Sequence, residues 1–239
     1  MKKIAIFAEG QSESIFTRYL LGNIFDYNLI SFECLKLHAG NFQPVPFKYN
    51  NPNANLHFLI INVQGDGNVV SAIKEREKKL IDDGYDRIIG LRDMYSEEYD
   101  KHSGGCIKPE ITKKFIDGHN IIVSQMSSPK KIYICFSIME IEAWFLSINN
   151  IFERIHSSLT IEFINQNLNI DISKINPEEI FHPANIIKNI YQLCGMKYDK
   201  SENDIENIVS KISIEDILDS LDKVKCSSFN SFFELLNVS

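Results

Sequence analysis

The stretch Ile4-Ala5-Ile6-Phe7-Ala8-Glu9-Gly10 decides the fold, because its apolar run ends in a carboxylate and a glycine. A short apolar run bounded in this way is typical of a buried strand. Gln11-Ser12-Glu13 then opens an amphipathic helix. In open α/β sheets, ligands gather where strands end and helices begin. Glu9 is therefore expected at a ligand-binding edge of a sheet.

Strands and helices alternate beyond this stretch. We predict strands at 3–8, 30–38, 57–63, 87–92 and 131–136. We predict helices at 12–22, 109–117 and 138–148, and a further helix between the strands at 57–63 and 87–92 that ends at about 82. The segment 39–55 is expected to be a loop, because it carries three prolines and several asparagines. A second loop is expected from 93 to about 109. This alternation predicts an α/β fold with a mostly parallel sheet flanked by helices.

The pattern changes after Asn150. From there on, the apolar residues follow helical spacing only, as at Ile186-Ile187-Ile190 and Phe229-Phe232-Phe233. We therefore expect two parts, an α/β domain at 1–150 and a helical region at 151–239 packed on it.

Composition limits the function. The chain has 239 residues and is 44% hydrophobic, which is enough for a full core. Its formal charge is −7, so no global basic field favours nonspecific duplex binding. Contacts to nucleic acid must be local, and the basic helix face at 74–79 is one candidate. No P-loop motif is present, which argues against nucleotide hydrolysis by that route.

The cysteines and the hydropathy bear on location. Five widely spaced cysteines contain no Cys-x-x-Cys pair, as expected for reduced thiols in a cytosol. No apolar stretch approaches the roughly 18 residues of a membrane-spanning helix. We expect a cytoplasmic protein without membrane contact.

Carboxylates recur at the ends of the predicted strands. Glu9 and Asp93 each follow a strand, Glu13 lies one helical turn beyond Glu9, and Glu140 and Glu142 follow the strand at 131–136. Hard oxygen ligands from several elements suit Mg²⁺ or Mn²⁺. Each acid also has a structural interpretation. A strand-end glutamate can cap a helix, and Glu140 and Glu142 can form a salt-bridged first turn. Acids at three strand ends together favour a metal site.

These residues resemble a known family. Glu9-Gly10-x-Ser12-Glu13 after a strand, an aspartate after a later strand and Glu142-Ala143-Trp144 after another are similar to TOPRIM-like nucleases of the AriB type, the effectors of PARIS anti-phage systems. OLD-type TOPRIM nucleases are more distantly similar. His182-Pro183 and Tyr198-Asp199-Lys200, with Ser228-Phe229, extend the resemblance to the C-terminal half.

The resemblance implies a TOPRIM fold and magnesium- or manganese-dependent cleavage of phosphodiesters. It implies RNA as substrate, notably tRNA, in anti-phage defence by abortive infection, with control by an ABC-type ATPase partner. A homodimer is left open. Carried over, Glu9 is the TOPRIM glutamate, Glu13 the second acid of that motif, Asp93 the first aspartate of the usual Asp-x-Asp and Glu142 the acid before Ala-Trp. Glu140 joins them as a metal ligand. Lys200 is a candidate for a phosphate contact.

One departure changes the ligand count. Tyr95 stands where the family has the second aspartate. Either Glu97, Glu98 or Glu142 supplies the missing oxygen, or metal binding and catalysis are weak. The second alternative describes an interaction subunit whose main task is to dock on the ATPase.

Overall fold

The computed structural model describes residues 1–25, 27–65, 68–223 and 225–236. The chain divides into two compact units. The first unit consists of Met1–Arg92 and Pro109–Phe136, and the second of Asp93–Lys108 and Ser137–Ser239. Each unit is described by itself below.

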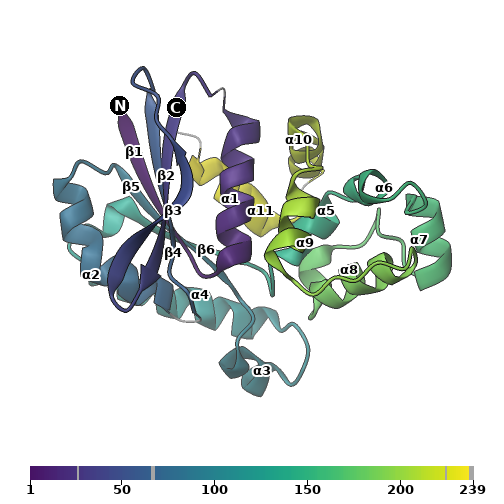
Figure 1. Ribbon diagram of the computed structural model, residues 1–239. Helices are drawn as coiled ribbons and strands as arrows, with labels where there is room; N and C mark the ends of the chain where they lie inside the picture. Colours follow the sequence, from purple (N-terminus) through teal and green to yellow (C-terminus); the bar gives the residue numbers. More distant parts are fainter. Residues whose placement is uncertain (26, 66–67, 224, 237–239) are drawn as a thin grey trace. The chain divides into compact units, whose positions relative to one another are not determined.

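A six-stranded sheet forms the first unit (Figure 1). Its strands are β1 (Lys2–Ala8), β2 (Ile30–His38), β3 (Asn41–Tyr49), β4 (Leu56–Asn62), β5 (Arg87–Asp93) and β6 (Ile132–Ser137), in the order β3-β2-β4-β1-β5-β6. β1 runs parallel to β4 and β5, and β4 runs parallel to β2. This confirms the predicted α/β fold with a mostly parallel sheet. The last residues of β5 and β6, Asp93 and Ser137, belong to the second unit.

The crossover helices lie on opposite faces of the sheet. α1 (Gln11–Ile24) links β1 to β2, while α2 (Asn68–Asp82) links β4 to β5 in the other direction along the sheet. Because such connections are right-handed, the two helices cover different faces, as Figure 1 shows. β1 is therefore the strand at which the connections change face. Such a switch point leaves a crevice at the strand end, and Glu9 is the next residue.

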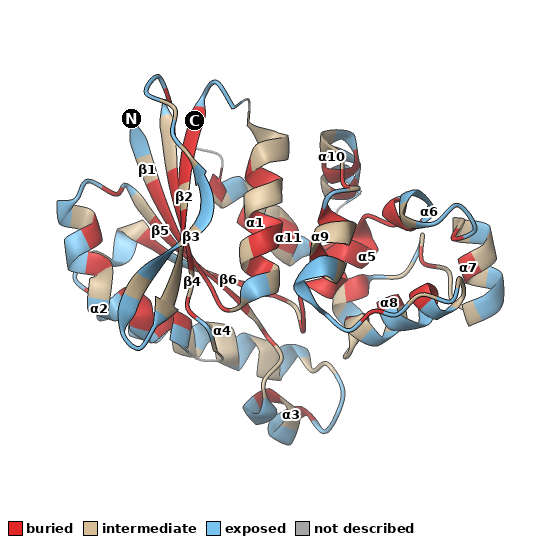
Figure 2. Ribbon diagram, in the orientation of Figure 1, coloured by how far each residue is buried: buried red, intermediate tan, exposed pale blue. Residues whose placement is uncertain are grey.

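The strands at the centre of the first unit's sheet, β1, β4 and β5, are buried along most of their length (Figure 2). Ala5 and Phe7 pack in one cluster with Val69 and Ile73 of α2, whereas Ile6 points to the opposite face, where α1 lies. α4 (Pro109–Ser124) contributes its buried residue to the same cluster as α2. The end of β1, and hence Glu9, is thus held between two packed layers.

The prediction of a loop at 39–55 is wrong for most of that segment. β3 occupies Asn41–Tyr49 and pairs antiparallel with β2. The hairpin turns at Ala39 and Gly40, whose φ values are 48° and 77°, as expected for a tight turn. β3 is an edge strand, where proline removes no ladder hydrogen bond that the sheet needs. The proline signal therefore marked an edge and not a loop.

The other predicted bounds need smaller corrections. The loop predicted from 93 contains α3 (Glu97–Ser103), and α4 continues to Ser124, beyond the predicted end at 117. The predicted helix at 138–148 is shorter, because α5 begins only at Glu142 and ends at Ser147. η1 (Pro129–Lys131) precedes β6.

Helices make up the rest of the second unit, as the sequence predicted. They are α6 (Ile151–Ile155), α7 (Ile161–Leu168), η2 (Pro177–Glu179), α8 (Pro183–Gln192), α9 (Glu202–Val209), α10 (Ile214–Asp222) and α11 (Ser227–Leu236). Trp144 of α5 is fully buried against Phe229 and Phe232 of α11. Its indole N–H donates to Ser228 Oγ at 2.8 Å. This contact fixes α5, and with it Glu142, to the end of the chain.

The predicted boundary at residue 150 stays a prediction, since compactness does not show which parts fold independently. Among the described residues, no helix is both long and apolar enough to cross a bilayer. All five cysteines are free thiols.

Candidate acidic site

Glu9 lies in the first unit beside a buried cation. Its amide donates to the Leu91 carbonyl of β5 at 2.9 Å, so the chain continues the β1–β5 register past the end of β1. Oε2 of Glu9 lies 3.3 Å from Nε of Arg92, and each side chain is only 8% exposed. The guanidinium therefore compensates the charge of Glu9 within this unit.

His119 of α4 continues this contact. Its Nε2 lies 2.9 Å from Nη1 of Arg92, and its Nδ1 lies 2.8 Å from the carbonyl oxygen of Phe115. A carbonyl only accepts, and a guanidinium only donates. The ring is therefore the neutral tautomer, with its proton on Nδ1. Burial, together with the charge of Arg92, lowers the pKa of His119 although the bond to Phe115 opposes this.

Glu13 caps the start of α1. Its Oε2 accepts the Gly10 amide hydrogen at 2.9 Å, and the side chain is buried. This is a capping interaction at the helix N-terminus, a role that the sequence analysis offered for the strand-end glutamate, Glu9. The same geometry turns the carboxylate back toward the end of β1, so a second role as a ligand stays a prediction.

Asp93 and Ser137 open the acidic part of the second unit. Oδ1 of Asp93 accepts a hydrogen bond from Ser137 Oγ. The Met94 amide donates to the Ser137 carbonyl at 2.9 Å, and the Tyr95 amide donates to the Met139 carbonyl at the same distance. The backbone that carries Asp93 is therefore tied to the backbone that leads to Glu140 and Glu142.

Glu140, Glu142 and Lys200 form one ionic cluster in the second unit. Nζ of Lys200 lies 2.7 Å from Oε1 of Glu140 and 3.3 Å from Oε1 of Glu142. The other oxygen of Glu140 accepts the Ala184 amide hydrogen of α8 at 3.3 Å. Burial alone would lower the pKa of Lys200, but the carboxylates of Glu142 and Glu140 outweigh it and raise the pKa. Lys200 therefore remains a cation.

Glu142 is the most enclosed of these acids, at 1% exposure. Tyr198 donates its hydroxyl hydrogen to Oε1 at 2.8 Å. Burial raises the pKa of Glu142, against the opposing effect of Lys200. The second oxygen, Oε2, is buried and has no hydrogen-bond partner among the described residues. A buried carboxylate oxygen without a donor is costly, and a bound cation would satisfy it.

The carboxylate oxygens of these residues are ligands that suit a hard divalent ion. Glu142 Oε2, which has no hydrogen-bond partner among the described residues, is the oxygen that such an ion would contact. Within neither unit do three His, Cys, Asp or Glu side chains of the described residues gather as metal ligands. The structure thus brings Glu140, Glu142 and Lys200 together, and it places Glu9 with Arg92. Whether the acids of the two units share one ion stays a prediction.

Tyr95 packs its ring against Phe181 and His182, with centroid distances of 5.9 and 5.2 Å. The acids suggested as substitutes for the missing aspartate lie on α3. Glu97 and Glu98 are both exposed, and Glu98 lies 2.9 Å from His102 Nε2 on the surface of the same helix. These contacts favour Glu142 among the three alternatives.

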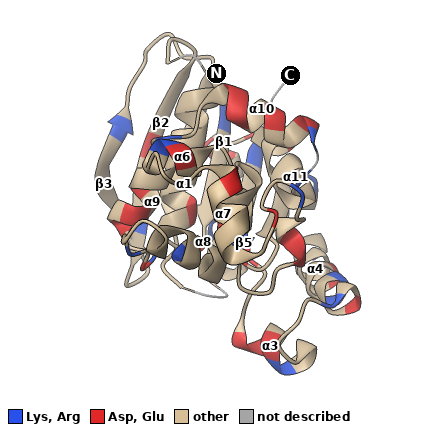
Figure 3. Cartoon of the chain, turned by 90° about the vertical axis from the view of Figure 1, so that its right-hand side faces the viewer, with Lys and Arg blue, Asp and Glu red and all other residues tan. Residues whose placement is uncertain are grey.

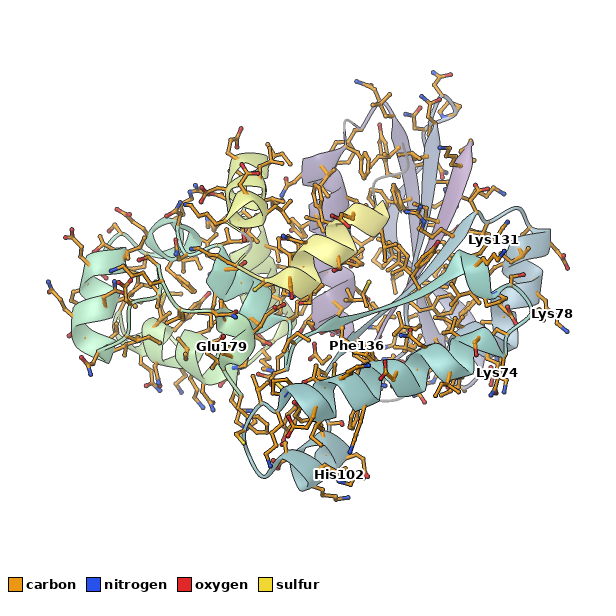
Figure 4. All side chains as sticks on the ribbon, turned by 180° about the vertical axis from the view of Figure 1, so that it is seen from behind. Lys74, Lys78, His102, Lys131, Phe136 and Glu179 are labelled. Atoms are coloured by element: carbon orange, nitrogen blue, oxygen red, sulfur yellow. The ribbon has the colours of Figure 1, made fainter. Side chains whose placement is uncertain are left out.

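The sequence analysis assigned no contact to Tyr198 or His119. Tyr198 was named only as part of Tyr198-Asp199-Lys200, and His119 lies in no motif that marks a ligand. Only the fold shows their partners. The basic face of α2 is as expected: Lys74 and Lys78 are exposed (Figure 4). Acidic residues mark α3 and α10 of the second unit (Figure 3).

Comparison with known proteins gives one similar structure. No protein-family model matches the chain, and no curated protein matches it in sequence. The chain is similar to the C-terminal region of the OLD protein of Xanthomonas campestris pv. campestris, with 12% sequence identity and a TM-score of 0.35. The match covers 91% of this chain and 95% of that one.

Proposed function

We propose that the chain is a metal-dependent, TOPRIM-like nuclease that cleaves RNA, tRNA in particular, as a toxic effector in anti-phage defence. The observation that carries the proposal is the buried carboxylate of Glu142. One of its oxygens has no hydrogen-bond partner among the described residues, and Lys200 lies 3.3 Å from the other. The placement of Glu9 after the switch strand β1 supports it.

In this proposal, Glu9, Asp93 and Glu142 hold Mg²⁺ or Mn²⁺, with Glu140 and Glu13 beside them. When bound, such an ion supplies an activated water and neutralises charge that builds up on the phosphate. The protein's own groups do the rest. Lys200 remains protonated next to Glu140 and binds the phosphate through its ammonium group. Tyr198 holds the carboxylate of Glu142 in one orientation.

Hydrolysis forms a bond from the water oxygen to phosphorus and breaks one phosphodiester P–O bond. The leaving oxygen takes up a proton from water, and the attacking water loses one to a carboxylate. Glu13 is the candidate base. Its Oε2 accepts the Gly10 amide hydrogen, which holds the carboxylate at the start of α1.

Incubation of the purified chain with tRNA tests the proposal. Cleavage should require Mg²⁺ or Mn²⁺, and it should disappear in Glu9→Gln and in Glu142→Gln while both variants keep their circular dichroism spectrum. Glu162→Gln is the matched control, because Glu162 is exposed on α7. Cleavage that persists in both active-site variants would refute the proposal.

A second candidate function is an interaction subunit that docks on a partner ATPase. The specific observation in its favour is that Arg92 and Lys200 already compensate Glu9 and Glu140. The gene neighbourhood should therefore be searched for an ABC-type ATPase, and the assay repeated with any such ATPase present. Tight binding to that protein without cleavage under any activating condition would favour the interaction subunit.

A further inference from the structure

The second unit contains a cavity that the acidic site does not explain. Its volume is about 240 Å³, and it is lined by Ala184, Asn185, Lys188, Tyr198, Asp199 and Lys200. Two of these side chains are cations that approach from α8 and from the segment before α9. The lining thus offers two ammonium groups and the Asn185 amide as donors, besides the Asp199 carboxylate, and these donors suit a phosphate group.

Both lysines are able to contact a ligand. Lys188 is exposed on α8, and within the described part of the chain no carboxylate pairs with it. Lys200 contacts Glu140, yet its side chain is 39% exposed. An ammonium group has three donors, so Lys200 can hold Glu140 and a phosphate oxygen at once.

Three aromatic rings of the same unit contact one another, and two of them, Phe181 and His182, directly precede α8, the helix that carries Lys188. Tyr95, Phe181 and His182 pack edge to face, with centroid distances of 4.6 to 5.9 Å. All three are half-buried. The core rings of this unit differ, because Trp144 and Phe229 are fully buried against each other. The edge-to-face cluster thus keeps accessible ring surface that the core cluster lacks.

Glu140 connects the rings to the cavity. Its Oε2 accepts the amide hydrogen of Ala184, a cavity residue two positions after His182, and its Oε1 contacts Lys200. On the other side, the Tyr95 amide donates to Met139, the neighbour of Glu140. The Tyr95 backbone, the start of α8 and Lys200 therefore all contact the segment Met139–Glu140.

We propose that this region is a subsite for one nucleotide of a single-stranded nucleic acid. Lys188 and Lys200 bind the backbone phosphate, and the base stacks on the cluster of Tyr95, Phe181 and His182. Base stacking on aromatic rings requires an unpaired base, so the subsite selects loops and single strands over duplexes. The inference deepens the proposed nuclease function and rests on it.

Binding tests the phosphate part without cleavage. Fluorescence anisotropy would follow a labelled 12-nucleotide RNA in EDTA with the full chain at several salt concentrations. For Lys188→Gln we expect weaker binding and a salt slope smaller by about 0.7, the contribution of one contact to a single strand. Lys223→Gln is the matched control, since Lys223 is 56% exposed on α10 and pairs only with Asp219 among the described residues. The control should bind like the wild type.

The base contact has its own readout. A 2-aminopurine in the strand should lose fluorescence on stacking. Phe181→Leu should restore that fluorescence and weaken binding about 5- to 150-fold, whereas Phe181→Tyr should bind like the wild type. A thermal melt identifies any variant that fails to fold, in which case Tyr95→Leu takes the place of Phe181→Leu.

Two results would overturn the subsite. One is wild-type affinity in both Lys188→Gln and Phe181→Leu, and the other is equal affinity of the wild type for a 12-base-pair duplex and the single strand. Failure of the nuclease proposal looks different, because the strand would then still bind in EDTA and depend on Lys188, but stay intact in Mg²⁺.

Discussion

The guanidinium of Arg92 lies 3.3 Å from the carboxylate of Glu9, and both side chains are buried. The acid that follows the switch strand β1 is thus paired with a cation of the same unit. Any ligand that uses Glu9 must compete with Arg92 or be held together with it. The contact explains how a carboxylate persists in a buried position without metal, and it has consequences for stability.

Arg92→Met should destabilise the protein by about 3–5 kcal/mol, because it leaves the Glu9 carboxylate buried without its guanidinium. Urea unfolding at pH 7.5 measures the change. The double variant Glu9→Gln/Arg92→Met should regain part of the lost stability, since neither charge of this ion pair remains. A cost below about 1 kcal/mol for the single variant would contradict the interpretation of this pair.

His119 should make stability depend on pH. Its pKa in the folded protein is lower than the ordinary value of 6.5, so below pH 6.5 the unfolded chain binds a proton that the folded chain does not. The contribution of His119 to the free energy of unfolding should therefore be fully present above pH 6.5. It should decrease as the pH falls toward the pKa of the folded protein. Urea titrations from pH 5 to 7.5 would show this.

His119→Gln should flatten that dependence without abolishing it. His57 also has a lowered pKa, owing chiefly to burial, and contributes in the same direction. A variant whose pH profile coincides with that of the wild type would contradict a lowered pKa of His119 in the folded protein.

The Tyr198 hydroxyl should matter for stability because its acceptor is the carboxylate of Glu142. Tyr198→Phe removes that donor, and hydrogen bonds to charged groups contribute about 1.5–3 kcal/mol. We expect a loss of this size in urea unfolding. Tyr133→Phe is the control, as this exposed hydroxyl donates to the Lys130 carbonyl at the surface, and its loss should stay within about 0.5 kcal/mol. Equal effects in the two variants would be inconsistent with a Tyr198–Glu142 bond.

Gly90 of β5 should tolerate no side chain. A Cβ atom there would lie 2.8 Å from side-chain atoms of both Ile134 and Val69, and overpacking of this kind costs about 1–3 kcal/mol. Gly118 in α4 has nothing within 4 Å of the same atom. Gly118→Ala should therefore stabilise by about 0.5–1 kcal/mol, because alanine is the better helix former. The two variants should move the melting temperature in opposite directions.

Much of the fold was predictable because periodicity reports burial. The run at 4–8 and the strand at 87–92 are buried on both faces of the sheet, so they read as continuous apolar segments. β3 was not predictable in the same way. Its side chains are mostly exposed and it contains Pro44 and Pro46, so neither alternation nor composition distinguishes this edge strand from a loop.

The candidate site was predictable in its acids but not in their partners. Glu9 and Asp93 could be located because a strand end is a position in the sequence. The pairing of Glu9 with Arg92, of Arg92 with His119 and of Tyr198 with Glu142 depends on side chains that meet only after folding. Tyr198 and Glu142 lie 56 residues apart, and no local pattern encodes such a contact.

Calorimetric titration with Mn²⁺ is the most direct test of the claim that acids of both units share a divalent ion. The wild type should bind the ion, and Glu9→Gln in the first unit and Glu142→Gln in the second should each abolish the same binding event. If each variant left the stoichiometry and affinity of the wild type unchanged, or if each removed a different one of two independent sites, the shared site and the mechanism built on it would be wrong.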